Sequence, residues 1–147
     1  MKQEDKELLL RDLCARVPYG VKVYNTTFKE PTIQTLYGKI SEDEFLMEET
    51  YTSVGVDGDD FGFFNKRHYS GHIDFIKPYL RPMSSMTKEE KIESLEFAWE
   101  DDYGRLASYD ENISKYIDWL NAHHFDYRGL IEKGLAIEAL EGMYNIE

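Results

Sequence analysis

The hydrophobic period of this chain changes twice along its length, and these changes limit the folds that it can adopt. Near the N-terminus, apolar residues recur at the three-to-four spacing of an amphipathic helix, as at Leu9, Leu13 and Val17. Between residues 21 and 76, apolar and polar residues alternate instead, which is typical of half-buried strands. Helical spacing returns after residue 87. This order predicts an α+β protein with an N-terminal helix, a sheet and a helical C-terminal part.

The middle of the chain contains five candidate strands. They cover residues 21–25, 32–40, 44–56, 61–65 and 72–76, and the strongest turn signal, DGDD, lies between the third and the fourth. Short strands at such regular spacing, without a helical interval, are typical of small closed or strongly bent sheets. We therefore expect a small antiparallel β-barrel or a bent sheet.

Two prolines and a capping signal mark the junction between sheet and helices. Pro78 and Pro82 lack the backbone donor that a strand ladder uses, so residues 77–82 are expected to leave the sheet. Thr87 and Glu90 have the spacing of a capping box, in which each side chain bonds to the backbone amide of the other residue. We therefore expect a helix to begin at residue 88.

Two to three helices are expected after this junction. The first runs to about residue 108, the second begins between residues 110 and 112, and a short third follows residue 126. Residues 1–82 would then hold the N-terminal helix and the β-barrel, and residues 83–147 a helical subdomain. The two parts are expected to pack together as one compact unit.

A glycine near the C-terminus predicts how the third helix ends. If Gly134 is the left-handed cap residue, Leu130 and Leu135 occupy the positions that touch in a Schellman motif. For the tail after residue 135 the sequence leaves two forms open, a final strand and an extended arm.

The net charge of −12 is concentrated in the C-terminal part of the chain. Residues 86–147 hold 15 acidic and 6 basic residues, so they carry −9 of this charge. A field of this sign repels phosphate groups, so we expect no direct nucleic-acid binding and no membrane association. A need for solubility and a basic protein partner each explain the charge.

The single cysteine and the start of the chain indicate a cytoplasmic protein. Cys14 has no second cysteine with which to form an intramolecular disulfide, and its apolar surroundings predict a buried thiol. The opening MKQEDKELLL has acids where a signal peptide has basic residues. No apolar run approaches the length of about 20 residues that a membrane helix needs.

His123, His124 and Asp126 form the densest group of potential metal ligands. Adjacent histidines on a helix point in different directions and do not readily share an ion, so we expect them at a helix end, with Asp126 capping the next helix. The turn at residues 57–60 does not match a calcium loop. No nucleophile motif or phosphate loop is present, so we expect no catalytic residue, metal or cofactor. A small metal-dependent hydrolase that uses these histidines or His72 is the least favoured alternative.

Aromatic residues supply the main functional lead. The run FGFF at residues 61–64 lies next to KRHY at 66–69, and strand alternation should expose about half of the aromatic side chains. Exposed tyrosine with arginine is typical of protein-binding surfaces. The sequence therefore predicts a noncatalytic domain that binds a protein partner, with candidate binding residues Tyr37, Phe61, Phe63, Phe64, Lys66, Arg67, Tyr69, Tyr79 and Arg81. The alternative is an acidic decoy or inhibitor that occupies a basic nucleic-acid-binding site.

Three blocks of the chain resemble a known family. They are KELLLRDLCARVPYGVKV, IDFIKPYLRPMSSMT and IDWLNAHHFDYRGLIEKGLA. The blocks are similar to a family of small uncharacterised proteins from gut anaerobes and their mobile elements, and this resemblance implies no activity, cofactor or catalytic residue. The β portion more loosely resembles SH3-like barrels, which implies a fold and no function.

Overall fold

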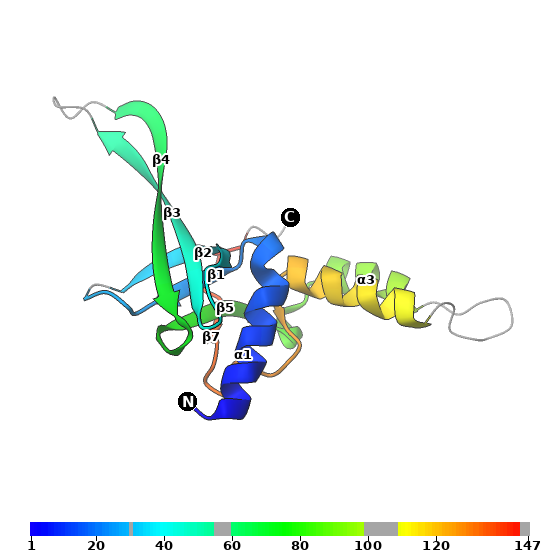
Figure 1. Ribbon diagram of the computed structural model, residues 1–147. Coiled ribbons are helices and arrows are strands. Elements are labelled where there is room, and N and C mark those ends of the chain that lie inside the picture. Colours follow the sequence, from blue (N-terminus) through cyan, green and yellow to red (C-terminus); the bar gives the residue numbers. More distant parts are fainter. Residues whose placement is uncertain (30, 55–59, 99–108, 145–147) are drawn as a thin grey trace, which may run out of the picture.

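The computed structural model describes residues 1–29, 31–54, 60–98 and 109–144, with the backbone alone for 50–54, 60–65, 98 and 109–112 (Figure 1). Its α-helices are α1 (Gln3–Arg16), α2 (Lys88–Ser94) and α3 (Tyr109–Ala122). Its strands are β1 (Lys22–Asn25), β2 (Thr32–Lys39), β3 (Glu44–Val54), β4 (Asp60–His72), β5 (Ile76–Pro82), β6 (Phe125–Asp126) and β7 (Ile137–Glu138). Short 3₁₀ turns lie at Val17–Tyr19, Ile73–Phe75, Met83–Ser85 and Leu95–Ala98. The α+β class and the order of its parts are confirmed.

The strands form one open, mainly antiparallel sheet. Their order is β4-β3-β2-β1-β5-β6, and β7 also pairs with β5. Strands β1 to β4 follow one another as an antiparallel meander, β5 joins β1 antiparallel, and the two-residue strands β6 and β7 run parallel to β5. Strand β4 stands at one end of this order and β6 at the other. Of the two forms that the sequence left open, the structure has the bent sheet and not a closed barrel.

A buried side chain bridges part of the gap between β4 and β1. Asn25 is fully buried, and its Nδ2 donates to the Ser70 carbonyl oxygen of β4 at 3.4 Å. The sheet bends so that these two strands approach each other at this point. A Cβ at Gly71 would lie 2.7 Å from both Ile76 Cγ2 and Met47 Cε, so a residue without a side chain permits the approach.

Helix α1 covers one face of the sheet, here called the inner face (Figure 1). Leu9 and Leu13 lie fully buried against inward-facing sheet residues. These sheet residues are Val21, Val23, Leu36, Phe45, Met47, Ile76 and Leu80. Cys14 is exposed, so the predicted buried thiol is wrong, because this position points about 100° away from the buried face of Leu13.

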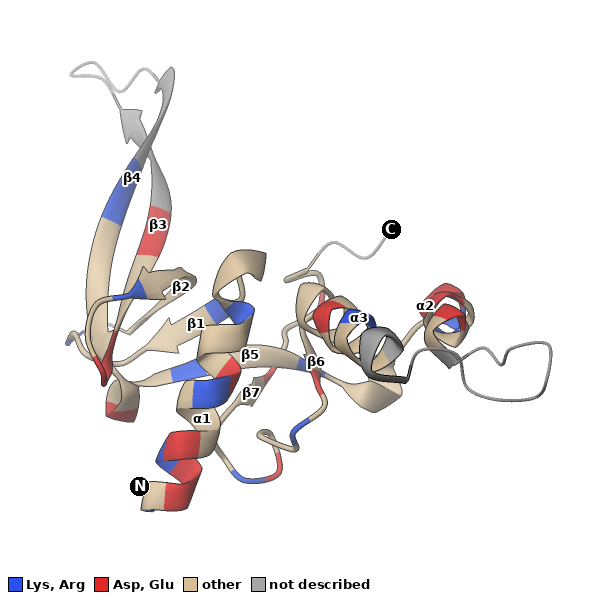
Figure 2. Ribbon diagram, turned by 45° about the vertical axis from the view of Figure 1, so that its right-hand side comes forward, with Lys and Arg blue, Asp and Glu red and all other residues tan. Residues whose placement is uncertain are grey.

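A second apolar cluster joins the C-terminal helices to the sheet. Trp119, Leu120 and Phe125 are its buried members. The Trp119 indole Nε1 donates to Glu93 Oε1 at 2.8 Å, which ties α3 to α2, and the two helices lie next to each other in Figure 2. Among the described residues, no helix combines the length and the apolar character needed to cross a membrane.

Strand β5 corrects the expectation that residues 77–82 leave the sheet. Thr26 N donates to the Phe75 carbonyl oxygen at 2.8 Å, and Arg81 N donates to the His124 carbonyl oxygen at 2.7 Å. Because backbone groups alternate along a strand, the missing donors of Pro78 and Pro82 point to the opposite side. On that side β5 faces β7, and the Leu80 carbonyl oxygen accepts a hydrogen bond from Ala139 N at 2.8 Å. This contact needs a carbonyl group of β5 and no N–H group. The residues predicted as the start of the fifth strand, 73–75, form a 3₁₀ turn instead.

The start of α2 and the turn near the C-terminus agree with the sequence signals. Both hydrogen bonds of the capping box between Thr87 and Glu90 are present. Residues 127–134 form turns instead of the short helix that was expected after residue 126. The predicted Schellman bonds exist nevertheless: Leu135 N donates to the Leu130 carbonyl oxygen at 2.9 Å, and Gly134 has φ +73°. The tail contains the short strand β7, followed by an irregular segment to residue 144.

Candidate binding surface

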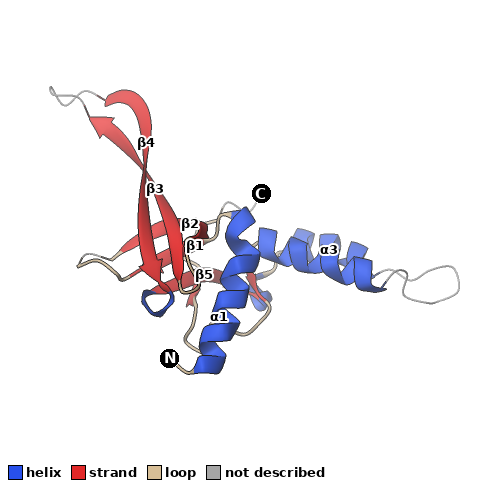
Figure 3. Cartoon of the chain, in the orientation of Figure 1, coloured by secondary structure: helices blue, strands red, loops and turns tan. Residues whose placement is uncertain are grey.

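Strands β3 and β4 extend beyond the rest of the sheet as a two-stranded ribbon (Figure 3). Strand β3 pairs with β2 only from Phe45 to Glu48. Its pairing with β4 continues to Val54, which faces Asp60. Residues 49–54 and 60–67, here called the β3–β4 ribbon, therefore have no third strand beside them among the described residues. This ribbon is the part of the sheet least covered by the body of the protein.

The direction of the backbone groups along β4 follows from one hydrogen bond. Ile73 N donates to the Asp43 carbonyl oxygen at 2.8 Å, and the same register continues without a break from Glu44–His72 to Thr52–Phe64. Hydrogen-bonded and non-bonded pairs alternate in an antiparallel ladder, so the odd-numbered residues of β4 bond to β3. The N–H and C=O groups of Phe64, Lys66 and His68 point away from β3. These outward groups define what we call the open edge of β4.

Four of the predicted binding residues lie at the base of the β3–β4 ribbon or next to it. The Tyr37 side chain is 57% exposed and its ring lies 5.3 Å from the His68 ring. Lys66 and Arg67 are exposed, and Lys66 Nζ lies 3.4 Å from Glu48 Oε1. Tyr69 is half-buried, with its ring 5.5 Å from that of Phe28.

Charge is distributed unevenly between the two strands of the ribbon. Figure 2 shows basic residues on β4 next to an acidic segment of β3. Glu48 lies 3.4 Å from both the Lys66 ammonium and the His68 ring, so an acid of β3 lies behind these two side chains as seen from the open edge. His68 was not among the predicted binding residues. Its spacing of two residues from Lys66 places the two side chains on the same face of the strand, and this spacing could have indicated it.

Three predicted residues lie where the structure describes the backbone alone. Phe61, Phe63 and Phe64 belong to β4, and their side chains fall outside the described part of the chain. The turn predicted at residues 57–60 also lies mostly outside it, and Asp60 is the first residue of β4.

Tyr79 and Arg81 lie in the interior and not on the surface where the sequence analysis placed them. Each is 5% exposed. Arg81 donates to both oxygens of Glu90, from Nη1 to Oε2 at 2.8 Å and from Nη2 to Oε1 at 2.6 Å, and its Cζ lies 4.2 Å from the Phe125 ring centroid. These hydrogen bonds lower the pKa of Glu90 to about 2. The guanidinium therefore joins β5, α2 and β6.

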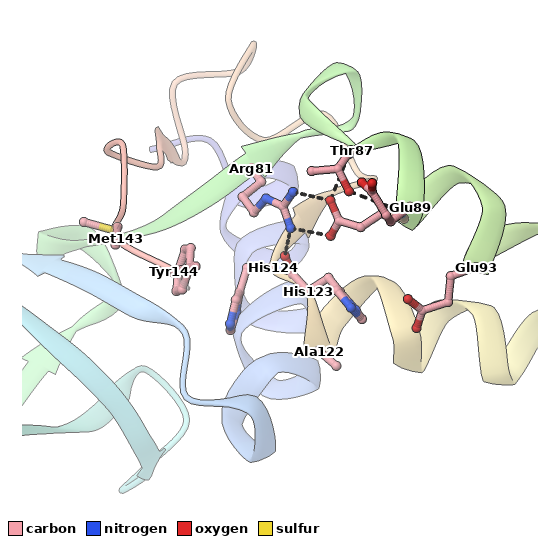
Figure 4. A pocket seen from close by; sticks show the side chains of 10 residues that line it. Arg81, Thr87, Glu89, Glu93, Ala122, His123, His124, Met143 and Tyr144 are labelled. Carbon is pink, nitrogen blue, oxygen red and sulfur yellow. Dashed lines mark hydrogen bonds and ion pairs between the residues drawn. The ribbon is translucent and has the colours of Figure 1, made fainter. Parts of the chain in front are cut away.

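A cavity of about 430 Å³ lies beside this ion pair (Figure 4). Arg81, Glu90, His123, His124 and Tyr144 contribute to its walls. The rings of His124 and Tyr144 stack with centroids 3.9 Å apart. Burial and the nearby positive charge of Arg16 lower the pKa of His124 to about 4, so its imidazole is neutral near pH 7.

His123 and Asp126, two of the potential ligands that the sequence singled out, lie close to backbone groups. His123 Nδ1 lies 2.9 Å from the Trp119 carbonyl oxygen at the end of α3, as the helix-end interpretation predicted. Asp126 accepts from the amides of Leu130 and Ile131 at 2.9 and 3.0 Å, so it holds a turn and does not cap the helix that was expected to follow it. His72 accepts from the Asp74 amide in another part of the chain. The described residues contain no group of three potential ligands that could hold an ion.

The comparisons with known proteins add no relative to this description. No family model matches the chain, and no curated protein or solved structure gives a significant match.

Proposed function

We propose that the chain is a noncatalytic protein-interaction domain that binds a protein partner through the β3–β4 ribbon and the exposed residues at its base. The observation that carries this proposal is the continuation of the β3–β4 ladder past the last pairing with β2. A two-stranded ribbon is only marginally stable by itself in water. A ribbon that the rest of the protein does not cover can therefore be stabilised by another protein, which adds a third strand or packs against one of its faces.

The side chains at the base of the ribbon support the same role. Exposed Tyr37 of β2 stands beside His68 of β4, and Lys66 and Arg67 precede His68 on the same strand. Tyrosine and arginine contribute more than their share of the binding energy at protein interfaces. Glu48 restricts the orientation of both Lys66 and His68, so part of the conformational entropy is lost before any partner binds.

A ribbon-shortened variant tests this proposal. Residues 50–66 are replaced by Asn-Gly, which joins the paired residues Glu49 and Arg67 through a two-residue turn. The core of the sheet and α1 are untouched, so the variant should still unfold in one cooperative thermal transition. In parallel affinity purifications from the native host, the full chain should recover a partner about tenfold more efficiently than the variant does. Equal recovery by the two proteins would contradict the proposal.

An acidic decoy is the second candidate, and exposed acids on the second helix favour it. Glu89, Glu93 and Glu96 are exposed on α2 and the 3₁₀ turn that follows it. Other acids of this region, at residues 100–102, lie outside the described part of the chain. A charge-driven decoy should release its partner between roughly 50 and 200 mM salt, whereas a ribbon contact should keep it. Washing the captured complexes at both concentrations separates the two functions.

A further inference from the structure

We propose that the partner contributes an extended, acidic segment that adds to the open edge of β4 as a further antiparallel or parallel strand. This inference rests on the proposed protein-binding function and specifies how the binding takes place. Strand addition satisfies backbone donors and acceptors that face away from β3, and it converts a two-stranded ribbon into a three-stranded sheet.

The structure limits where along β4 a strand can add. At the C-terminal end of the strand, the outward carbonyl oxygen of Ser70 already accepts from Asn25 Nδ2 at 3.4 Å. The next residues enter the 3₁₀ turn Ile73–Phe75. Within the unbroken register, which ends at the pair Thr52–Phe64, the remaining outward groups belong to Phe64, Lys66 and His68. The added strand therefore pairs with the stretch from about residue 63 to residue 68. Such a length suits a short linear segment better than a whole domain edge.

Cross-strand neighbours determine which segment fits best. An added strand lies next to the side chains of β4, about 5 Å away, while those of β3 are one strand further off. On β4 these neighbours are Lys66, Arg67 and His68, whose side chains are all exposed. Opposite charges on directly facing positions stabilise a strand pair, and like charges destabilise it. Acidic side chains on the added strand are therefore favoured although the chain as a whole carries −12.

The same neighbours argue against a second copy of this chain as the added strand. Antiparallel pairing of two β4 strands about a two-fold axis at Lys66 places the two Lys66 side chains opposite each other. An axis at Arg67 places the two Arg67 side chains opposite each other. Both registers bring like charges together, so self-association is disfavoured at this edge.

Two synthetic peptides test the proposal with the full chain. One is an acetylated, amidated seven-residue peptide in which valine alternates with glutamate, and the other carries lysine in place of glutamate. Backbone amide exchange and chemical shifts are followed by NMR during titration. The glutamate peptide should bind about tenfold more tightly than the lysine peptide, and it should slow exchange at the amides of Lys66 and His68.

A pair of substitutions at one position separates the backbone contribution from the charge. Lys66→Pro removes an amide that does not bond to β3, and Lys66→Ala removes the same charge and keeps the amide. The proline variant should lose binding of the glutamate peptide by about tenfold more than the alanine variant does. Thermal unfolding checks that both variants are folded. Equal binding by the two variants would overturn strand addition.

The remaining outcomes also decide the question. A glutamate peptide that binds no better than the lysine peptide, or that perturbs amides elsewhere, would overturn the proposal. So would a concentration-dependent dimer that Lys66→Pro abolishes, since the second copy would then be the occupant. If Lys66→Pro still captures a partner that the ribbon-shortened variant loses, strand addition is wrong and the protein-binding role stands. If both variants capture every partner, the β3–β4 ribbon is not the binding surface, and the proposed function falls as well.

Discussion

At the scale of single residues, Gly71 sets how closely β4 approaches β1 and β5. Its neighbours Ile76 and Met47 are buried, and each would lie 2.7 Å from an added Cβ. Ile76 is β-branched and cannot easily rotate away. Gly71→Ala should therefore lower the free energy of unfolding by about 1 to 3 kcal/mol, as overpacked cores do.

Urea unfolding of this variant measures the effect, and Gly38→Ala is the matched control. A Cβ at Gly38 meets no atom within 4 Å. The control should change stability much less than Gly71→Ala does. If the two substitutions cost the same, crowding at Gly71 is not what limits the bend of the sheet.

His124 gives the protein a pH-dependent stability. Its pKa is about 4 in the folded state, below the ordinary value of 6.5, mainly because of burial. The unfolded chain therefore binds this proton more readily, so the stabilising contribution is complete above pH 6.5 and is lost as the pH falls towards 4. Glu90, with a folded pKa of about 2, adds a further loss below its ordinary value of 4.5.

Urea unfolding between pH 7 and pH 4 tests the histidine. His124→Asn tolerates the positive φ of 63° at this position and removes the titrating ring, so it should flatten the loss of stability between pH 6.5 and 4.5. The same substitution at His123 controls for the loss of an imidazole. An unchanged pH dependence in His124→Asn would show that another group is responsible.

At the scale of elements, a side chain of the C-terminal tail replaces one pair of backbone hydrogen bonds between β1 and β5. The register of these strands would next pair Lys22 with Tyr79. The Tyr144 hydroxyl lies between their backbone groups instead, where it accepts from Lys22 N at 2.8 Å and donates to the Tyr79 carbonyl oxygen at 2.7 Å. Burial raises the pKa of Tyr144 far above its ordinary value, so this donor is not lost near neutral pH.

Tyr144→Phe should therefore destabilise the fold by about 1 to 3 kcal/mol, because it leaves a buried amide and a buried carbonyl without a partner. Tyr37→Phe removes a hydroxyl from a side chain that is 57% exposed and should have almost no effect. Thermal unfolding of the two variants checks the difference. Equal melting temperatures would show that the tail does not hold the strands together.

Four features of the fold show what local sequence patterns could and could not predict. The alternation from residue 21 and the capping box at Thr87 depend on nearby residues, and both were predictable. Strand β5 was not predictable. A proline interrupts a strand only if its missing N–H is needed for a hydrogen bond, and the pairing of the strand decides this. Strand β4 was expected to end at residue 65, since residues 66–71 have no apolar alternation; their pairing with β3 holds them in the strand instead.

At the scale of the whole molecule, the α+β architecture follows from the order of the two periodicities, whereas the candidate site depends on long-range contacts. Tyr37 and Lys66, two of the predicted binding residues, are exposed. Arg81, another of them, is buried, because it pairs with Glu90 and packs against Phe125, which is 44 positions away in the chain. The open edge itself requires knowing which residues of β4 bond to β3, and no single-strand pattern contains that information.

The central claim is that β4 presents unpaired backbone groups to a partner, and amide hydrogen exchange of the dilute free chain tests it most directly. The account predicts an alternating pattern, in which the amides of Tyr69 and Gly71 exchange slowly and those of Lys66 and His68 exchange quickly. If Lys66 and His68 are as protected as their neighbours, another part of the chain already covers this edge, and the proposed binding surface does not exist.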